Sequence, residues 1–416
     1  MKKQTRTTVT SARRGVKDPA SATTAGKGKT TNSSGAVRSA KANERAAIIW
    51  QGFGHEWSVA PHRMGDFANY IKGDKATLSG ATPPNQTLDI ESTAHCTFKP
   101  GEDGDGAACQ TYYRPIFHNN VGIKRGYWVD SFTDHVDYSR KELPATISRR
   151  EKRQISTESV DLNWGRFDNY VVVLRGFDMD LKNPDSGETG YIFPTHFKIK
   201  IEKCVLSADR KNIDCELVIQ ITREDNPDID KGQEERMTYD FKVYFTVIGG
   251  DSQDFQETLR KRYGISDKHF EKGTAVVSRT ETLHPTVDAL ITGITGFEFS
   301  LESNQIRDGR FLKNYEMYVF DHAIDRAKRQ KKLSVYMGIN GLPTPIIGTN
   351  AATFNATIYT VHMAFKNDPL STDSTQQANM ALCTSYGWTS PIVNCGGMEK
   401  TSDSQSIQHT ISSNGN

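Results

Sequence analysis

A glycine–phenylalanine phrase occurs three times in this chain, and its even spacing constrains the fold more than any other feature. The three occurrences are IIWQGFGHEWS (48–58), VVLRGFDMDLK (172–182) and ITGITGFEFSLES (291–303). Gly52, Gly176 and Gly296 are 124 and 120 residues apart, and 120 residues follow Gly296. This spacing predicts a long unit that is present three times in tandem. The alternative is a chance recurrence in a β-rich chain.

Large side chains occupy every second position after each glycine. In the second copy these are Phe177, Met179 and Leu181, with Asp178 and Asp180 between them. Such alternation is typical of a strand with one buried and one solvated face. Similar segments, separated by turns, recur along the chain. We therefore expect a mainly β fold of tandem antiparallel β-sandwich-like domains.

The repeat also sets the expected domain boundaries. A flexible basic arm is expected over residues 1–45, followed by β domains over 46–158, 159–285 and 286–416, the last with a polar C-terminal tail. A chain of 416 residues exceeds what one hydrophobic core usually supports. The second domain is expected to contain one short helix over 253–262, capped by Ser252 and ended by Gly264.

The expected arm is strongly basic. Residues 1–43 carry ten Lys or Arg and one acid, Asp18, so the arm is +9 and the rest of the chain is −7. Few apolar residues are available to offset the chain entropy, so we expect the arm to be disordered in isolation. It can bind a polyanion such as nucleic acid through Lys2, Lys3, Arg6, Arg13 and Arg14, or reach a neighbouring subunit. Alternatively, it is a targeting or packaging address, or a solubilising tail; no apolar segment typical of a signal peptide follows the basic start.

Composition describes a solvated surface and no membrane span. Charged residues make up 25% of the chain and the mean hydropathy is −0.60. We find no run near the roughly 18 apolar residues that a transmembrane helix requires. We therefore expect no transmembrane segment.

Six cysteines fall into three local pairs, Cys96/Cys109, Cys204/Cys215 and Cys383/Cys395. We expect each pair to form a disulfide. If Asp209 and Arg210 form a two-residue hairpin loop, Cys204 and Cys215 lie opposite each other within bonding range. Disulfides imply an extracellular or particle-associated location, reached without a classical signal peptide. The alternative is six reduced thiols in a cytoplasmic protein.

The densest polar cluster is GFGHEW…PHR, which holds His55, Glu56, Trp57, His62 and Arg63. The two histidines could coordinate a metal or bind an anionic or sugar ligand, with Trp57 as a stacking platform. We favour a purely structural role for both histidines, with His55 in the core and His62 in a turn. A lectin-like glycan site would also use Trp128 and Trp388.

Two further groups resemble metal sites. The loop GEDGDG places Glu102, Asp103 and Asp105 among glycines, which suits Ca²⁺, although a plain turn is favoured. A zinc site would use His95, Cys96, Cys109 and His118, but the ligand spacing lacks the close pairs that structural zinc sites show. We expect no cofactor.

Two basic runs are candidate polyanion-binding loops. One is expected to project as a hairpin tip and the other to join the first two copies. Solvated loops without a ligand are the favoured alternative for both. The first run contains Arg326, Lys328, Arg329, Lys331 and Lys332, and the second contains Arg149, Arg150, Lys152 and Arg153.

Nucleophile and nucleotide motifs are absent from the sequence: it has no GxSxG, no phosphate loop and no GxGxxG after a strand. We therefore expect a non-enzymatic structural, assembly or binding protein that acts outside the cytoplasm, with self-association, a protein assembly, nucleic acid or glycan as partner. One alternative is a secreted or injected effector or toxin whose basic tail is an export or packaging address. A further alternative is a metal-dependent hydrolase centred on His55 and His62.

Overall fold

A computed structural model shows an all-β protein and confirms the predicted fold class. The structure describes twenty strands and, between them, residues 157–158, 183–187, 207–211, 283–287, 327–329 and 366. The expected arm, residues 1–45, lies outside the described residues. Within the described part, no helix is long and apolar enough to cross a membrane.

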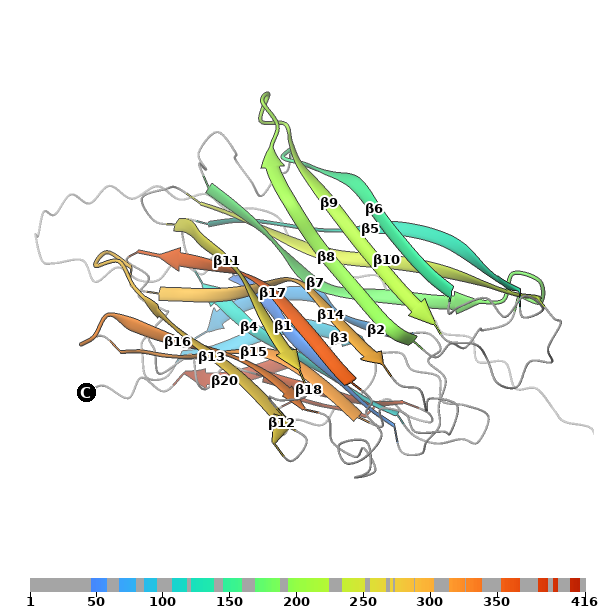
Figure 1. The fold of residues 1–416 in the computed structure, drawn as a ribbon. Coiled ribbons are helices and arrows are strands. Elements are labelled where there is room, and N and C mark those ends of the chain that lie inside the picture. The colour runs from blue at the N-terminus through green and yellow to red at the C-terminus, as the bar shows by residue number, and fades with distance from the viewer. Residues whose placement is uncertain are drawn as a thin grey trace, which may run out of the picture. The chain divides into compact units, whose positions relative to one another are not determined.

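Figure 1 shows the described strands, which are grouped below by the three expected repeats. Residues 46–158, 159–285 and 286–416 are called copies 1, 2 and 3. Copy 1 contains β1 (Ala46–Trp57), β2 (Phe67–Ser79), β3 (Gln86–His95), β4 (Ala107–Phe117), β5 (Val121–Asp137) and β6 (Ala145–Ser156). Copy 2 contains β7 (Asn169–Lys182), β8 (Pro194–Leu206), β9 (Asn212–Arg223), β10 (Glu234–Gly250), β11 (Phe255–Ser266), β12 (Phe270–Glu271) and β13 (Thr274–Thr282). Copy 3 contains β14 (Ala289–Glu302), β15 (Asn314–Asp325), β16 (Gln330–Gly338), β17 (Thr353–Phe365), β18 (Ala381–Gly387), β19 (Ile392–Cys395) and β20 (Gln405–Ile411).

Three antiparallel sheets form, and each draws strands from all three copies. Sheet 1 has the order β12-β13-β16-β15-β1-β4-β18-β19, sheet 2 the order β20-β3-β2-β7-β10-β5, and sheet 3 the order β6-β9-β8-β14-β17-β11. The strand that carries the Gly-Phe phrase is the first of its copy (β1, β7 or β14), and it lies inside its sheet. The next two strands of that copy pair in the following sheet, and the fourth returns beside the first.

The exchange is cyclic. Copy 1 sends β2, β3 and β5 to sheet 2, copy 2 sends β8, β9 and β11 to sheet 3, and copy 3 sends β15, β16 and β18 to sheet 1. The last strand of each copy goes one sheet further: β6 to sheet 3, β13 to sheet 1 and β20 to sheet 2. The predicted boundaries therefore mark where the order of the strands repeats. They do not mark the limits of sandwiches that pack independently. All described strands lie in one compact unit, 40–416.

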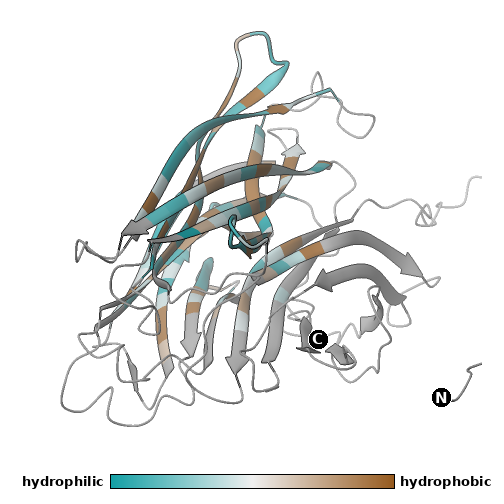
Figure 2. Cartoon of the chain, turned by 90° about the vertical axis from the view of Figure 1, so that its right-hand side faces the viewer, coloured by the Kyte–Doolittle hydropathy of each residue, from teal (hydrophilic) through white to brown (hydrophobic). Residues whose placement is uncertain are grey.

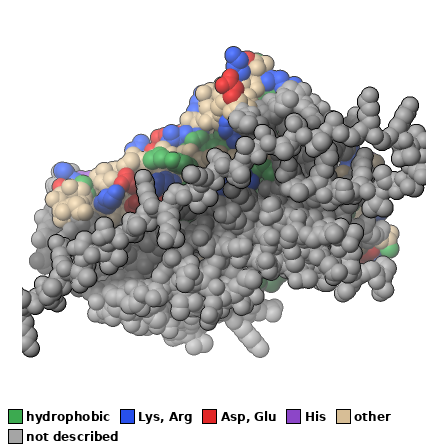
Figure 3. All heavy atoms as spheres, turned by 180° about the vertical axis from the view of Figure 1, so that it is seen from behind, with side chains coloured by type: hydrophobic (Ala, Val, Ile, Leu, Met, Phe, Trp, Pro, Cys, Tyr) green, Lys and Arg blue, Asp and Glu red, His purple; other side chains and the backbone are tan. Residues whose placement is uncertain are grey.

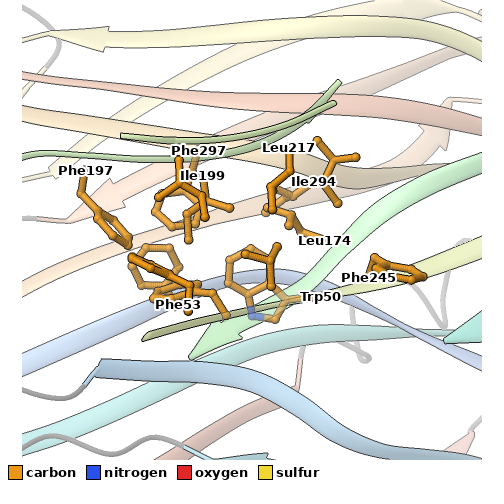
Figure 4. Packing of buried hydrophobic residues seen from close by; sticks show 14 of the residues in the cluster. Trp50, Phe53, Leu174, Phe197, Ile199, Leu217, Phe245, Ile294 and Phe297 are labelled. Carbon is orange, nitrogen blue, oxygen red and sulfur yellow. The ribbon is translucent and has the colours of Figure 1, made fainter. Parts of the chain in front are cut away.

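The three phenylalanines of the repeat belong to one core cluster, in which Figure 4 labels Phe53 and Phe297. The ring centroids of Phe53 and Phe297 are 4.8 Å apart, those of Phe177 and Phe297 5.4 Å, and those of Phe53 and Phe177 5.7 Å. Trp50 stacks on Phe53 at 5.6 Å, and its indole Nε1 donates to Asn69 Oδ1. Each phenylalanine is at most 1% exposed. The alternation seen in the sequence therefore points these residues inward, as predicted, and Figure 2 shows apolar and polar residues alternating along described strands.

The predicted helix over 253–262 is wrong, because residues 255–262 belong to strand β11; residues 253 and 254 lie outside the described residues. Phe255, Tyr263 and Ile265 are buried, whereas Gly264 between the last two is exposed. β11 pairs along β17 at the edge of sheet 3. Burying these apolar side chains outweighs the weak local preference of the sequence for a helix.

Side chains of β6, an edge strand of sheet 3, contact β5, an edge strand of sheet 2. Arg153 Nη2 lies 3.4 Å from both the Val129 carbonyl and Asp130 Oδ2 on β5. The Arg149 guanidinium lies 5.7 Å from the centroid of the Phe132 ring. The basic run at 149–153 was expected to be a loop, and it is part of a strand instead. Its odd-numbered arginines face β5 because side chains alternate along β6.

Candidate functional site on the outer face of sheet 3

The three glycines of the repeat occupy equivalent positions, and two large side chains from the flanking strands cover each of them. A pair of stacked aromatic side chains above a glycine is a known way to stabilise a sheet at a residue without a side chain. In sheets 1 and 2 both side chains are tyrosines. Tyr112 and Tyr318 stack at 4.3 Å over Gly52, and Tyr70 and Tyr244 stack at 4.1 Å over Gly176.

Sheet 3 departs from this pattern. Gly296 pairs with Tyr359 on β17 and with Lys200 on β8, so a lysine stands where the other sheets have a second tyrosine. Lys200 Nζ lies 4.2 Å from the centroid of the Tyr359 ring. The residues that flank the three equivalent glycines can therefore be compared directly. The comparison shows that the outer face of sheet 3 differs from those of sheets 1 and 2.

The same face of β8 carries two more basic groups. Lys198 pairs with Glu298, and His196 pairs with Ser300. The position equivalent to Lys198 is Ala68 in sheet 2 and Glu316 in sheet 1, since these residues pair with Asp178 and Gly54, two residues after each glycine. The row of His196, Lys198 and Lys200 is therefore a feature of sheet 3.

Glu298 lies at the centre of this face and accepts three charged or polar hydrogen bonds. Its Oε1 accepts from His196 Nε2 at 3.0 Å, and its Oε2 accepts from the Tyr359 hydroxyl at 2.7 Å and from Lys198 Nζ at 3.0 Å. The His196 bond, opposed by partial burial and helped by Tyr359 and Lys198, holds the pKa of Glu298 well below its usual range. Burial and the bond to Glu298 raise the pKa of Tyr359 to about 12. Glu298 is therefore a permanent acceptor and Tyr359 a permanent donor near neutral pH.

A second set of ion pairs continues the charged surface toward β6. Glu202 pairs with Lys200 Nζ at 2.5 Å and with Arg150, while Glu216 pairs with Arg150 at 2.7 Å and with Lys203 at 2.9 Å. Burial raises the pKa of Glu202, but the bonds from Lys200 and Arg150 outweigh it and leave a net lowering. The face presents charges of both signs in a fixed pattern, which suits recognition of a polar partner and gives each pair little stability by itself.

These residues carry no motif, so the sequence analysis missed them. The available signal was the alternation HFKIKIE, which places His196, Lys198 and Lys200 on one face of a strand. Their partners are about a hundred residues away, at Glu298, and further still at Tyr359. A pairing between strands of different copies has no local signature.

Most of the site residues predicted from the sequence lie outside the described part. His55, Glu56 and Trp57 end strand β1, where His55 pairs with Tyr315 and Cys109, but their side chains are not described. His62, Arg63, Glu102, Asp103, Asp105, Cys96, His118 and the arm residues Lys2, Lys3, Arg6, Arg13 and Arg14 lie outside the described residues. Among the side chains that the structure does describe, no three His, Cys, Asp or Glu are placed to hold a metal ion.

The basic tip before β16 is only partly available to a polyanion. Lys331 is fully buried and donates to the Leu290 carbonyl, and Arg329 donates to the carbonyls of His284 and Val287. The expectation that these two groups project into solvent is therefore wrong: Lys331 lies on the inward face of β16, and Arg329 folds back onto a neighbouring turn. Lys328 and Lys332 are exposed, Lys328 pairs with Asp325 at 2.9 Å, and Arg326 is not described.

Cys204 and Cys215 are free thiols, so the predicted disulfide is not formed. The predicted register is close to the observed one, since Val205 faces Asp214. However, Lys203 has a φ of 53° and forms a bulge that leaves Cys204 out of the ladder. A hydrogen bond with Cys204, together with burial, raises the pKa of the Cys215 thiol far above its usual value. The Cys215 thiol therefore stays protonated and inert at neutral pH.

The other predicted disulfides concern side chains that are not described. Cys383 and Cys395 are directly opposed in the β18–β19 hairpin, as the local pairing predicts for the backbone. Cys109 faces Ser385 of β18 and His55 of β1. These two pairings stay predictions.

Comparisons with known proteins identify no relative. No protein-family model matches the chain, and no curated protein or solved structure matches it.

Proposed function

We propose that this protein is a non-enzymatic structural or binding subunit of an assembly outside the cytoplasm, and that its basic arm connects it to a neighbouring subunit or a polyanion. The observation that supports this proposal is the cyclic exchange of strands among three copies. The exchange buries the repeat phenylalanines in one shared core and leaves the outer faces of the sheets for contact with partners.

The outer surfaces favour specific polar contacts. The outer face of sheet 3 carries the ion-pair network centred on Glu298, and the described surface seen from behind also mixes Lys and Arg with Asp and Glu side chains (Figure 3). Surfaces with interspersed charges of both signs suit an interface that must be oriented, because complementary charges fix the register of two partners.

The test compares the full chain with a variant that lacks residues 1–45. Light scattering after size-exclusion chromatography and electron microscopy measure assembly, and titration with a labelled oligonucleotide measures polyanion binding. We expect the full chain to form regular assemblies or to bind the polyanion in a salt-dependent manner, and the shortened chain to lose this behaviour while its thermal unfolding stays the same. A full chain that stays monomeric at all concentrations and does not bind would contradict the proposal.

Fusing residues 1–45 to an inert reporter separates the effector alternative from this one. An export or packaging address would carry the reporter out of the producing cell. An assembly arm alone would leave it inside.

A further inference from the structure

The cycle of copies is closed without a covalent bond between copy 3 and copy 1. Copies 1 and 2 are joined through residues 157–168, and copies 2 and 3 through residues 283–288. Copy 3 meets copy 1 only by strand pairing: β15 pairs with β1, β18 pairs with β4 and β20 pairs with β3. The closing contacts are backbone ladders, and any chain with the same sequence can supply them.

The connection that leads to the closing strands is much longer than its equivalents. The fourth and fifth strands of copy 1 are joined by residues 118–120, and those of copy 2 by residues 251–254. In copy 3 the equivalent connection between β17 and β18 runs from 366 to 380. The connection between the fifth and the last strand shows the same contrast, with residues 138–144 in copy 1 and residues 388–404, including β19, in copy 3.

The extra length is not needed for closure within one chain. Equivalent strands occupy equivalent places in the three sheets, and three or four residues are enough to make the step in copies 1 and 2. A connection from 366 to 380 can span about 50 Å when extended, at roughly 3.3–3.6 Å per residue. This reach allows β18 to leave its own copy and pair with another molecule.

We propose that copies of this chain assemble by exchanging the segment β18–β20, so that the closing strands of one molecule complete sheets 1 and 2 of another. The proposal rests on the assembly function above and names its partner, a second copy of the same chain. Exchange reproduces every contact of the closed form, so the two forms differ little in contact energy and concentration decides between them. Two molecules that exchange reciprocally form a dimer, and one-way exchange forms a chain of molecules.

The experiment uses two differently tagged full chains expressed together. One carries Thr87→Cys on β3 and the other Thr410→Cys on β20, since these two threonines are directly opposed. Opposed residues of an antiparallel pair lie within disulfide range. Under mild oxidation, we expect a heterodimer that joins both tags on a non-reducing gel, with a linked peptide containing residues 87 and 410 by mass spectrometry.

A matched control uses another opposed threonine pair in the same sheet. Thr133 on β5 and Thr238 on β10 are directly opposed, and their hydroxyls are 2.8 Å apart. Each of these strands has a short connection to a neighbouring strand of its own molecule, residues 118–120 before β5 and residues 251–254 after β10. Co-expressed chains with Thr133→Cys and Thr238→Cys should give no crosslink between chains.

A deletion then tests the role of the long connection. Removing residues 369–379 leaves four residues between β17 and β18, as in copy 2. We expect this deletion to abolish the 87–410 crosslink between chains, while a single chain that carries both Thr87→Cys and Thr410→Cys still closes on itself. A crosslink between chains that survives the deletion would overturn the role of the connection. If the full chain assembles without any 87–410 crosslink between molecules, exchange is overturned while the proposed assembly function stands.

Discussion

At the scale of single residues, a buried ion pair joins two of the sheets. Arg223 on β9 of sheet 3 donates from Nε and Nη2 to the two carboxylate oxygens of Asp134 on β5 of sheet 2, at 2.7 and 3.0 Å. Asp134 also accepts from the Met237 amide and from the Tyr239 hydroxyl. Arg223 is 2% exposed. A buried charge without its partner would be strongly destabilising.

Asp134→Ala should therefore lower the free energy of unfolding by about 3–5 kcal/mol, because it leaves Arg223 buried and uncompensated. Denaturant unfolding followed by circular dichroism measures the change. The control is Asp240→Ala, which removes the partly exposed partner of Lys182 at 2.9 Å and of the Ser131 hydroxyl at 2.6 Å and should cost less than about 2 kcal/mol. Equal losses in the two variants would contradict the importance of the buried pair.

Glu298 gives a second prediction at this scale, which concerns pH. Its pKa is lower in the folded protein than in the unfolded chain, chiefly because of the His196 bond. Its contribution to stability is therefore present above its ordinary pKa of about 4.3, and it is lost as the pH falls below that value. We expect Glu298→Gln to destabilise the protein at neutral pH, and the difference from the wild type to shrink steadily below about pH 4.

Unfolding free energies measured at several pH values test this expectation. Tyr359→Phe is the companion variant, because it removes one donor to Glu298 and keeps the carboxylate with its His196 and Lys198 bonds. It should retain most of the dependence on acid. A difference between wild type and Glu298→Gln that stays constant with pH would show that the carboxylate charge is not involved.

At the scale of strands, the repeat glycine allows two strands to approach more closely than a side chain would permit. Gly52 has a φ of 143° and Gly176 a φ of 123°, a region that favours glycine. A Cβ at Gly52 would lie 2.0 Å from the Met317 carbonyl oxygen, and one at Gly176 would lie 2.2 Å from the Asn69 carbonyl oxygen. The residue before each glycine also forms a β-bulge, at Gln51 and Arg175.

Gly52→Ala and Gly176→Ala should each destabilise the protein by more than about 2 kcal/mol, since both backbone strain and overpacking result. Gly264→Ala on β11 is the matched control, because a Cβ there meets nothing within 4 Å. Thermal unfolding midpoints compare the three variants. A similar, small shift in all three variants would show that the strands can move apart at the repeat glycine with little loss of stability.

At the scale of the whole molecule, cooperativity follows from the cyclic exchange. No copy forms a complete sheet by itself within the described strands, since each sheet takes its edge and inner strands from different copies. The three repeat phenylalanines also contact one another directly. The copies should therefore unfold together, and a cut between two copies should not separate them.

A protease site inserted within residues 159–168, between β6 and β7, tests this prediction. After cleavage, we expect both fragments to elute together from a native size-exclusion column and to separate only in denaturant. The uncut insertion variant controls for the added loop. Elution of residues 46–158 as a separate folded species would contradict the exchange of strands.

The sequence by itself indicated the all-β class, the inward faces of the Gly-Phe strands and the threefold repeat. Alternation is a local property with a period of two residues, so the Gly-Phe phrase was enough to place Phe53, Phe177 and Phe297 in the core. The sequence also placed Cys204 near Cys215, because the register of a short hairpin depends on its turn. Where propensity alone was used, at 253–262, the prediction of a helix failed.

Only the tertiary structure decided which strands pair. The hydrogen-bonding edges of all strands are chemically alike, so the choice between a neighbour in sequence and a strand of another copy depends on how the side chains pack into the shared core. That choice brings His196 and Lys198 to Glu298, and it turns Lys331 inward. The interleaved sheets and the charged face of sheet 3 both result from packing over long sequence distances, which no local pattern records.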